Sequence, residues 1–115
     1  MAIPSGSGTE VIKHFSKYDH NSASQVTAIT GVANHIYTVV SIIAWSMHST
    51  APLGLEIRFD DGTNTNIQLV KTEVPANGTF VFNDKFSFVG DVNLHLYSAG
   101  NGFNWHVTYI DQDWT

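Results

Sequence analysis

The sequence predicts an all-β protein, an antiparallel β-sandwich of the jelly-roll type with about eight strands. Three observations lead to this prediction. Apolar and polar residues alternate with a period of two in several segments, turn-forming clusters separate these segments, and no window of ten or more residues shows the apolar stripe of a helix. Such alternation is typical of strands with one buried and one wet face, and many short strands separated by turns are typical of sandwiches and barrels.

The alternation is clearest in LEIRF (55–59), VNLHLY (92–97) and FNWHVTY (103–109), where every second residue is apolar. Clusters rich in Gly, Asn, Asp and Pro lie between the alternating segments and predict turns: DDG (60–62), PANG (75–78), NDK (83–85), VGD (89–91) and SAGNG (98–102). We therefore expect strands at residues 10–15, 24–32, 35–47, 53–60, 66–71, 79–83, 86–89, 91–98 and 103–110.

The segment HIYTVVSIIAWSM (35–47) differs because it is apolar on both faces of the expected strand. Six of residues 36–43 are β-branched, which favours a strand over a helix. Strict alternation places Ile36, Val40 and Ile42 on one face. It places the other apolar residues on the second face: Tyr37, Val39, Ile43, Trp45 and Met47. Such a strand is either central and covered on both sides, or it has its second face in a subunit interface, and this second face supplies our interface candidates.

Composition excludes several classes of protein. The chain has 115 residues, enough for one domain with its own core, of which 43% are apolar and 13% charged. A net charge of −5 with five Lys and Arg argues against binding a phosphate backbone, so we expect no nucleic-acid partner. There is no cysteine, which excludes disulfides and thiolate metal sites.

The first residues predict a flexible arm rather than a targeting signal. MAIPSGSGT (1–9) is Gly- and Ser-rich and has neither a basic nor an apolar region of a signal peptide. The longest apolar stretch, at 36–45, is too short to span a membrane. We therefore expect an arm over 1–9, a β-sandwich domain over 10–115, synthesis in a cytoplasm and no membrane partner.

The stretch FDDGTNTN (59–66) raises the question of a calcium loop. Asp60 and Asp61 are adjacent, so they point to opposite sides of extended backbone, and no Glu follows at the spacing of an EF-hand. Asp-Gly between two alternating segments is instead a strong hairpin signal. We interpret this stretch as a hairpin tip.

Six histidines raise the question of a metal site. No pair forms H-x-H or H-E-x-x-H. His95 and His106 fall on the outward parity of their strands and would approach each other if those strands formed a hairpin, but two imidazoles alone make a poor site. No nucleophile motif or paired carboxylate stands out. We therefore expect no metal, no cofactor and no catalytic residue.

Three tryptophans and four tyrosines suggest an alternative, a glycan-binding module. That function requires at least two exposed, clustered aromatics from one set: Tyr37, Trp45, Tyr97, Trp105 and Trp114. Trp45 and Trp105 lie on apolar parities, where core packing is the plainer expectation. Trp114 lies beyond the last expected strand, where it can either dock on the domain or contact a partner.

The chain from HIYTVVSIIAWSM through LEIRFDDGTNTNIQLVKTEVPANGTFVFND to VNLHLYSAGNGFNWHVTYID resembles small β-sandwich structural proteins of tailed bacteriophages. In those proteins a strand ending in a D-G tip is followed by a V-P-A-N-G-T-F-V step, and a Gly-rich loop precedes a final V-T-Y strand. The resemblance covers about residues 30–112, and the family has no catalytic residues to carry over.

The resemblance implies a capsid cement (decoration) protein, which binds the outer surface of an assembled shell and stabilises it. Such proteins often form trimers, so the expected partners are further copies of this chain and the major capsid protein. The expected location is the virion surface, after synthesis in the host cytoplasm. A strand that is apolar on both faces and a flexible arm suit this role, because exposed apolar patches on small domains usually mark interfaces.

Overall fold

The computed structural model describes residues 9–19, 24–100 and 102–115, which form nine β-strands. The strands are β1 (Thr9–Asp19), β2 (Ser24–Ile29), β3 (His35–Ser46), β4 (Leu53–Asp60), β5 (Ile67–Val74), β6 (Thr79–Phe82), β7 (Phe86–Val89), β8 (Asn93–Ser98) and β9 (Phe103–Asp113). All nine predicted strands are present, and most of their bounds lie within three residues of the prediction. Within the described residues there is no helix able to cross a membrane.

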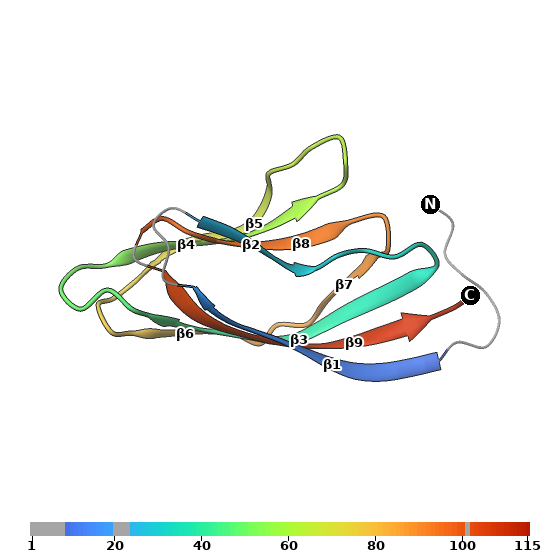
Figure 1. Ribbon diagram of the computed structural model, residues 1–115, viewed down its shortest axis with the longest axis horizontal. Coiled ribbons are helices and arrows are strands. Elements are labelled where there is room, and N and C mark those ends of the chain that lie inside the picture. The colour runs from blue at the N-terminus through green and yellow to red at the C-terminus, as the bar shows by residue number, and fades with distance from the viewer. Residues whose placement is uncertain (1–8, 20–23, 101) are drawn as a thin grey trace.

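The strands form two antiparallel sheets that stack as a sandwich (Figure 1). Sheet A has the order β1-β9-β3-β6, with β7 also beside β3, and sheet B has the order β2-β8-β4-β5. The two short strands β6 and β7 pair with successive halves of β3, so together they act as one edge strand interrupted at residues 83–85. Counted in this way, each sheet has four strands in jelly-roll order, which confirms the predicted fold class.

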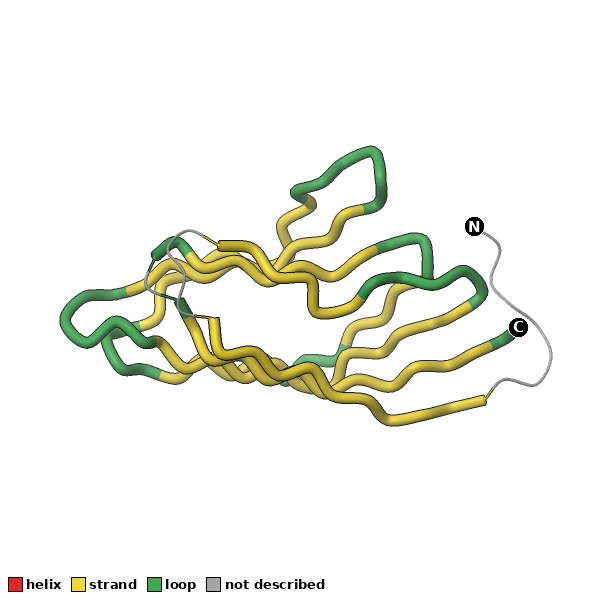
Figure 2. The backbone as a smooth tube through the Cα atoms, in the orientation of Figure 1, coloured by secondary structure: helices red, strands yellow, loops and turns green. Residues whose placement is uncertain are grey.

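The hydrophobic core lies between the two sheets, which Figure 2 shows as two stacked layers of strands. Its largest fully buried apolar side chains come from both layers: Phe103, Ile42, Val39 and Val107 from sheet A, and Leu55, Ile57, Leu94 and Leu96 from sheet B. These residues occupy alternate positions of their strands because successive side chains of a strand point to opposite faces. Trp105 is 2% exposed, which confirms its predicted place in the core.

A β-bulge in β3 overturns the predicted division of that strand into two faces. Val39 pairs with Tyr109 and Ser41 pairs with the adjacent Thr108, so Val40 is an extra residue that shifts the parity of everything after it. Inward residues are therefore odd-numbered before the bulge and even-numbered after it. The buried set is Tyr37, Val39, Ile42, Ala44 and Ser46. The prediction assumed unbroken alternation and was wrong on this point.

The first strand is longer than predicted. β1 begins at Thr9, which pairs with Asp113, and continues to Asp19, which pairs with Phe103. Thr9 therefore belongs to the sheet and not to the predicted arm, while residues 1–8 of that arm lie outside the described residues. β1 is an edge strand of sheet A, and most of its side chains are exposed.

Two loops meet backbone to backbone at one end of the sandwich, and two glycines make this possible. A Cβ atom on Gly90 would overlap the carbonyl oxygen of Val32, and one on Gly31 would overlap the carbonyl oxygens of Val92 and Gly90. Only a residue without a side chain allows this approach. The two glycines thus join the loop after β2 to the loop after β7.

We expect Gly90→Ala to destabilise the protein by at least about 2 kcal/mol, because a methyl group against backbone forces the two loops apart. Gly100→Ala is the matched control, since its Cβ would meet only the Leu53 side chain at 3.6 Å. Urea denaturation of both variants measures the difference. Equal unfolding midpoints for the two would contradict this account of the loop contact.

Candidate interaction surface

The outer surface of sheet A, here called the A face, is almost free of charge. Paired residues of neighbouring strands share a face, so its members follow from the register. They include Ile12, His14 and Ser16 of β1, Asn104, His106, Thr108 and Ile110 of β9, Thr38, Ile43 and Trp45 of β3, and Thr79 and Val81 of β6. Among the described strand positions of the A face, only Glu10 is an acidic or basic residue other than histidine.

Three apolar side chains form an exposed patch on the A face. Ile43 pairs directly with Val81, and Trp45 lies two residues further along β3. Their exposed fractions are 39% for Ile43, 54% for Val81 and 39% for Trp45. The Trp45 indole N–H donates to the Asn77 carbonyl oxygen at 3.1 Å, so the ring's polar atom is satisfied within the chain and its apolar surface is held in place. We call these three residues the apolar patch.

The outer surface of sheet B, the B face, is in contrast charged. Arg58 donates to Glu56 Oε1 through Nε at 3.1 Å and Nη2 at 2.9 Å. Its Nη1 donates to Gln25 Oε1 at 3.1 Å, and its guanidinium carbon lies 4.1 Å from the centre of the Tyr97 ring. Gln68 Nε2 donates to the same Glu56 oxygen. These charges are satisfied within the chain, so the two outer faces differ sharply in what they offer a partner.

The two histidines considered as a metal pair lie on opposite faces of the sandwich. Strands β8 and β9 belong to different sheets, so they do not form the hairpin that would bring the two histidines together. His106 lies on the A face and His95 lies on the B face. His95 is also 7% exposed rather than wet, and its Nδ1 lies 3.0 Å from Thr27 Oγ1. No three histidine or acidic side chains within the described residues are placed to hold a metal ion.

A buried carboxylate that sequence reasoning missed ties three strands of sheet A together. Asp111 of β9 is 5% exposed, and its Oδ2 accepts a hydrogen bond from Lys13 Nζ of β1 at 2.8 Å. Its Oδ1 lies 2.7 Å from Nδ1 of His35 of β3. The bond to Asp111 raises the pKa of the Lys13 ammonium group. In FNWHVTYID (103–111), Asp111 falls on the same face of the strand as the core residues. An acidic residue at such a position could have indicated a buried ion pair from the sequence alone.

The stretch around Asp60 and Asp61 is the tip of the β4–β5 hairpin, as predicted, and projects from the sandwich (Figure 2). Asp61 Oδ1 accepts hydrogen bonds from the backbone N–H groups of Thr63 at 2.9 Å and Asn64 at 2.7 Å. These bonds hold the pKa of Asp61 below its usual value. Asp60 Oδ1 accepts the N–H of Gly62, and its Oδ2 lies 3.5 Å from Nε2 of His95, so the two carboxylates contact the protein itself.

Of the predicted interface residues on β3, the structure separates those in the core from those on a free surface. Ile43 and Trp45 lie on the A face. Tyr37 and Val39 are 3% and 1% exposed inside the core, because the bulge turns them inward, so placing them on an interface with Ile43 and Trp45 was wrong. Met47 is half-buried just after β3.

The remaining interface candidate, Trp114, docks on its own domain. It is half-buried, and its backbone N–H donates to the Asn34 carbonyl oxygen at 3.0 Å. The residue just after β9 is therefore hydrogen-bonded to the loop that follows β2. The structure thus shows a contact of Trp114 with its own domain, and its contact with a partner stays a prediction.

The five aromatics considered for glycan binding lie in different places in the structure. Tyr37 and Trp105 are buried, and Trp114 is half-buried against its own domain. Trp45 is exposed on the A face, whereas Tyr97 lies under Arg58 on the B face. The five aromatics therefore do not cluster on one surface, so the glycan site predicted from these five residues is not formed.

No protein-family model matches the chain, and no curated protein matches it in sequence. Solved structures are similar in fold. A protein of the disulfide-linked pili of Bacillus endospore appendages is 15% identical, with 96% of this chain and 93% of that chain covered and a TM-score of 0.56.

Two further structures show the same fold. A chain of infectious bursal disease virus, Gx strain, is 8% identical over 96% of this chain, with a TM-score of 0.52. This chain spans 34% of that one. The Drosophila NLP core, described with pentamer formation and histone binding, is 8% identical over 89% of this chain and 95% of that chain, with a TM-score of 0.51. At these identities the similarity establishes the fold alone.

We expect the melting temperature to fall as the pH rises above about 10. Burial raises the pKa of Tyr37 and Tyr109 above 10.0, and the bond to Asp111 raises that of Lys13 above 10.5. A group with a raised folded-state pKa stabilises the fold below its unfolded pKa and loses that contribution as the pH passes its folded pKa. All three groups therefore act in the same direction.

Thermal unfolding between pH 8 and pH 11.5 measures this fall, and Tyr109→Phe should reduce it because one half-buried phenol no longer ionises. The Tyr109 variant also leaves the Asp111 contacts with Lys13 and His35 in place. A melting temperature that stays constant to pH 11 in the wild-type protein would contradict the expectation.

Proposed function

We propose that this chain is a structural protein of a tailed-bacteriophage virion, a capsid cement protein that binds the outer surface of the shell and stabilises it. The observation that carries the proposal is the A face, a surface with almost no charge on which Ile43, Trp45 and Val81 are exposed side by side. Exposed apolar patches on small domains mark interaction sites, and tryptophan is enriched among the residues that dominate binding energy.

The A face is large enough for a stable contact. Four strands about 4.8 Å apart and about ten residues long present roughly 600 Å² at about 3.3 Å per residue. Covering such a surface removes roughly 1,200 Å² from the two partners together, above the ~1,000 Å² expected of a specific interface. Few charged groups would lose their hydration, because the charged network lies on the B face.

The chain associates with itself, as a trimer, and with the major capsid protein. In a ring of three copies the apolar patch of each copy contacts a different surface of the next copy, outside the B face, because a three-fold contact is heterologous, and the rest of the A face is left for the major capsid protein. The B face then remains toward solvent with its ion pair intact. This role is non-enzymatic, and it requires neither a cofactor nor a nucleic acid.

Two kinds of similarity support the proposal. The sequence resembles small β-sandwich proteins of tailed phages in its V-P-A-N-G-T-F-V step (74–81) and its final V-T-Y strand. The structures with the same fold include a pilus protein and a viral chain, both from assemblies. The pili are disulfide-linked, whereas this chain has no cysteine, so its assembly rests on noncovalent contacts.

We expect Ile43→Glu to weaken self-association at least tenfold while the domain stays folded. The residue is exposed in the single chain, so the charge is tolerated there, but in an assembly it would be buried without a partner. Sedimentation velocity at about 100 μM should show an oligomer for the wild-type protein and a monomer for the variant. The concentration exceeds the dissociation constants of typical specific complexes.

The matched control is Val32→Glu, which places the same charge at an exposed apolar residue outside the A face. It should associate like the wild-type protein. A wild-type chain that stays monomeric at this concentration would remove self-association from the proposal. Mass spectrometry of particles from the phage that encodes the chain tests the location, and absence of the chain from those particles would overturn the proposal as a whole.

A further inference from the structure

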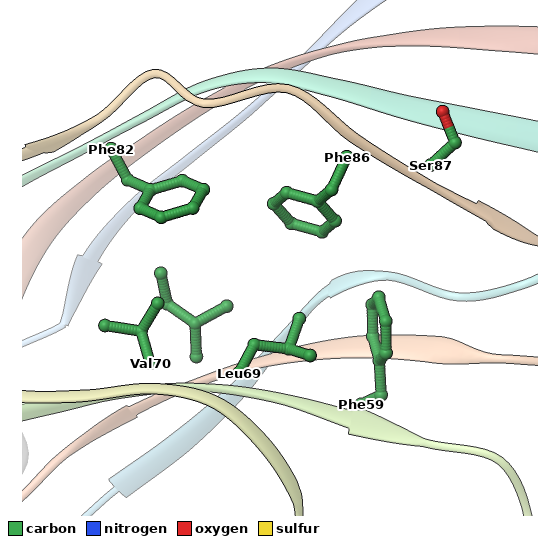
Figure 3. A pocket seen from close by; sticks show the side chains of 7 residues that line it. Phe59, Leu69, Val70, Phe82, Phe86 and Ser87 are labelled. Atoms are coloured by element: carbon green, nitrogen blue, oxygen red, sulfur yellow. The ribbon is translucent and has the colours of Figure 1, made fainter.

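An apolar pocket opens between the two sheets at the edge formed by β5 and by β6 and β7 (Figure 3). Its volume is about 190 Å³. Phe82 and Phe86 reach into it from sheet A, and Phe59, Leu69 and Val70 reach into it from sheet B. No function considered so far uses this pocket.

Three backbone irregularities occur where the pocket opens. Residues 83–85 interrupt the edge strand between Phe82 and Phe86, opposite the bulge at Val40 of β3. In sheet B, Ile57 pairs with Val70 while the next residue, Arg58, pairs with Gln68, so Leu69 is an extra residue of β5. Bulges bend a strand and redirect its side chains. Both edge strands are thus interrupted at the pocket, which keeps the sandwich from closing there.

The lining is aromatic and aliphatic carbon. The ring centres of Phe82 and Phe59 each lie 5.9 Å from that of Phe86, and Ile57 is fully buried behind them. The one polar residue that lines the pocket is Ser87, whose hydroxyl lies 3.0 Å from Thr38 Oγ1 and points away from the rings (Figure 3). No charged side chain lines the pocket, so a charged ligand would lose its hydration there without compensation.

We infer that this pocket binds a small uncharged molecule with a single aromatic ring. An apolar cavity of about 150 Å³ accommodates benzene and stays free of water, so a volume of about 190 Å³ suits one ring with a small apolar substituent. The three phenylalanines offer edge and face contacts that suit an aromatic guest. Leu69 is 41% exposed, so the guest enters beside it without opening the core.

Titration of the full chain with benzene, followed by NMR of the Leu69 and Val70 methyl groups, tests the inference. We expect saturable shifts of these signals, with a dissociation constant of roughly 1 mM or lower for so small a ligand. Benzoate carries the same ring with a carboxylate and should bind at least tenfold more weakly. Equal binding of the two ligands, or no saturable shift with benzene, would overturn the inference.

Leu69→Trp should reduce benzene affinity at least tenfold, because a larger side chain at the mouth occupies the pocket. Val11→Trp is the control, since Val11 is similarly exposed on β1 at the opposite edge of sheet A. If Leu69→Trp disturbs folding, the comparison of benzene with benzoate in the wild-type protein still tests whether the pocket binds an uncharged aromatic ring.

The same variants separate this inference from the proposed function. Ile43→Glu changes the A face and leaves the pocket lining untouched, so it should bind benzene like the wild-type protein. Leu69→Trp should sediment like the wild-type protein. Loss of self-association in Leu69→Trp with retention in Ile43→Glu would assign the pocket to a side chain of a second copy and overturn its assignment to a small molecule.

Discussion

The structure depends on β3, the one strand of sheet A that pairs with three others. It pairs with β9 along one side and with β6 and β7 along the other. A twelve-residue strand with strict alternation would put all its odd-numbered residues on one face. The bulge at Val40 instead places Val39 and Ile42 together in the core and releases Ile43 and Trp45 to the surface. The division of β3 between the core and the A face follows from this one extra residue, and the edge strand is interrupted opposite it.

The two outer faces of the sandwich differ in how many charged groups they carry. On the B face, Arg58 donates hydrogen bonds to Glu56 and Gln25 and lies over the Tyr97 ring. On the A face almost no charge is present to be satisfied. Covering a surface costs little where no charged groups lose water, so the A face is the side that the proposed contact would use.

Much of the fold could be predicted from local sequence, because alternation and turn residues act over a few positions. The hairpin tip at Asp60 and Asp61 and the core position of Trp105 are examples. The features that were predicted wrongly depend on pairing between strands that are distant in the sequence. The bulge at Val40 is defined only against β9, and His95 and His106 separate because β8 and β9 join different sheets. On the A face, Ile43 and Trp45 remain predicted interface residues; the exposure of Trp45 contradicts the plainer expectation of core packing, and Val81 and the contacts of Asp111 required the tertiary structure.

The interruption at residues 83–85 also bears on how such a chain avoids forming fibres. A long free edge strand is a template for uncontrolled addition of further strands. One edge of sheet A is divided into two four-residue pieces separated by Asn83, Asp84 and Lys85. The other edge, β1, carries Lys13 and Lys17 on its inward parity, and inward lysines are a known deterrent to edge pairing. Both edges of sheet A thus carry features that oppose the addition of further strands, which would keep the association proposed above from continuing along this sheet as an open-ended aggregate.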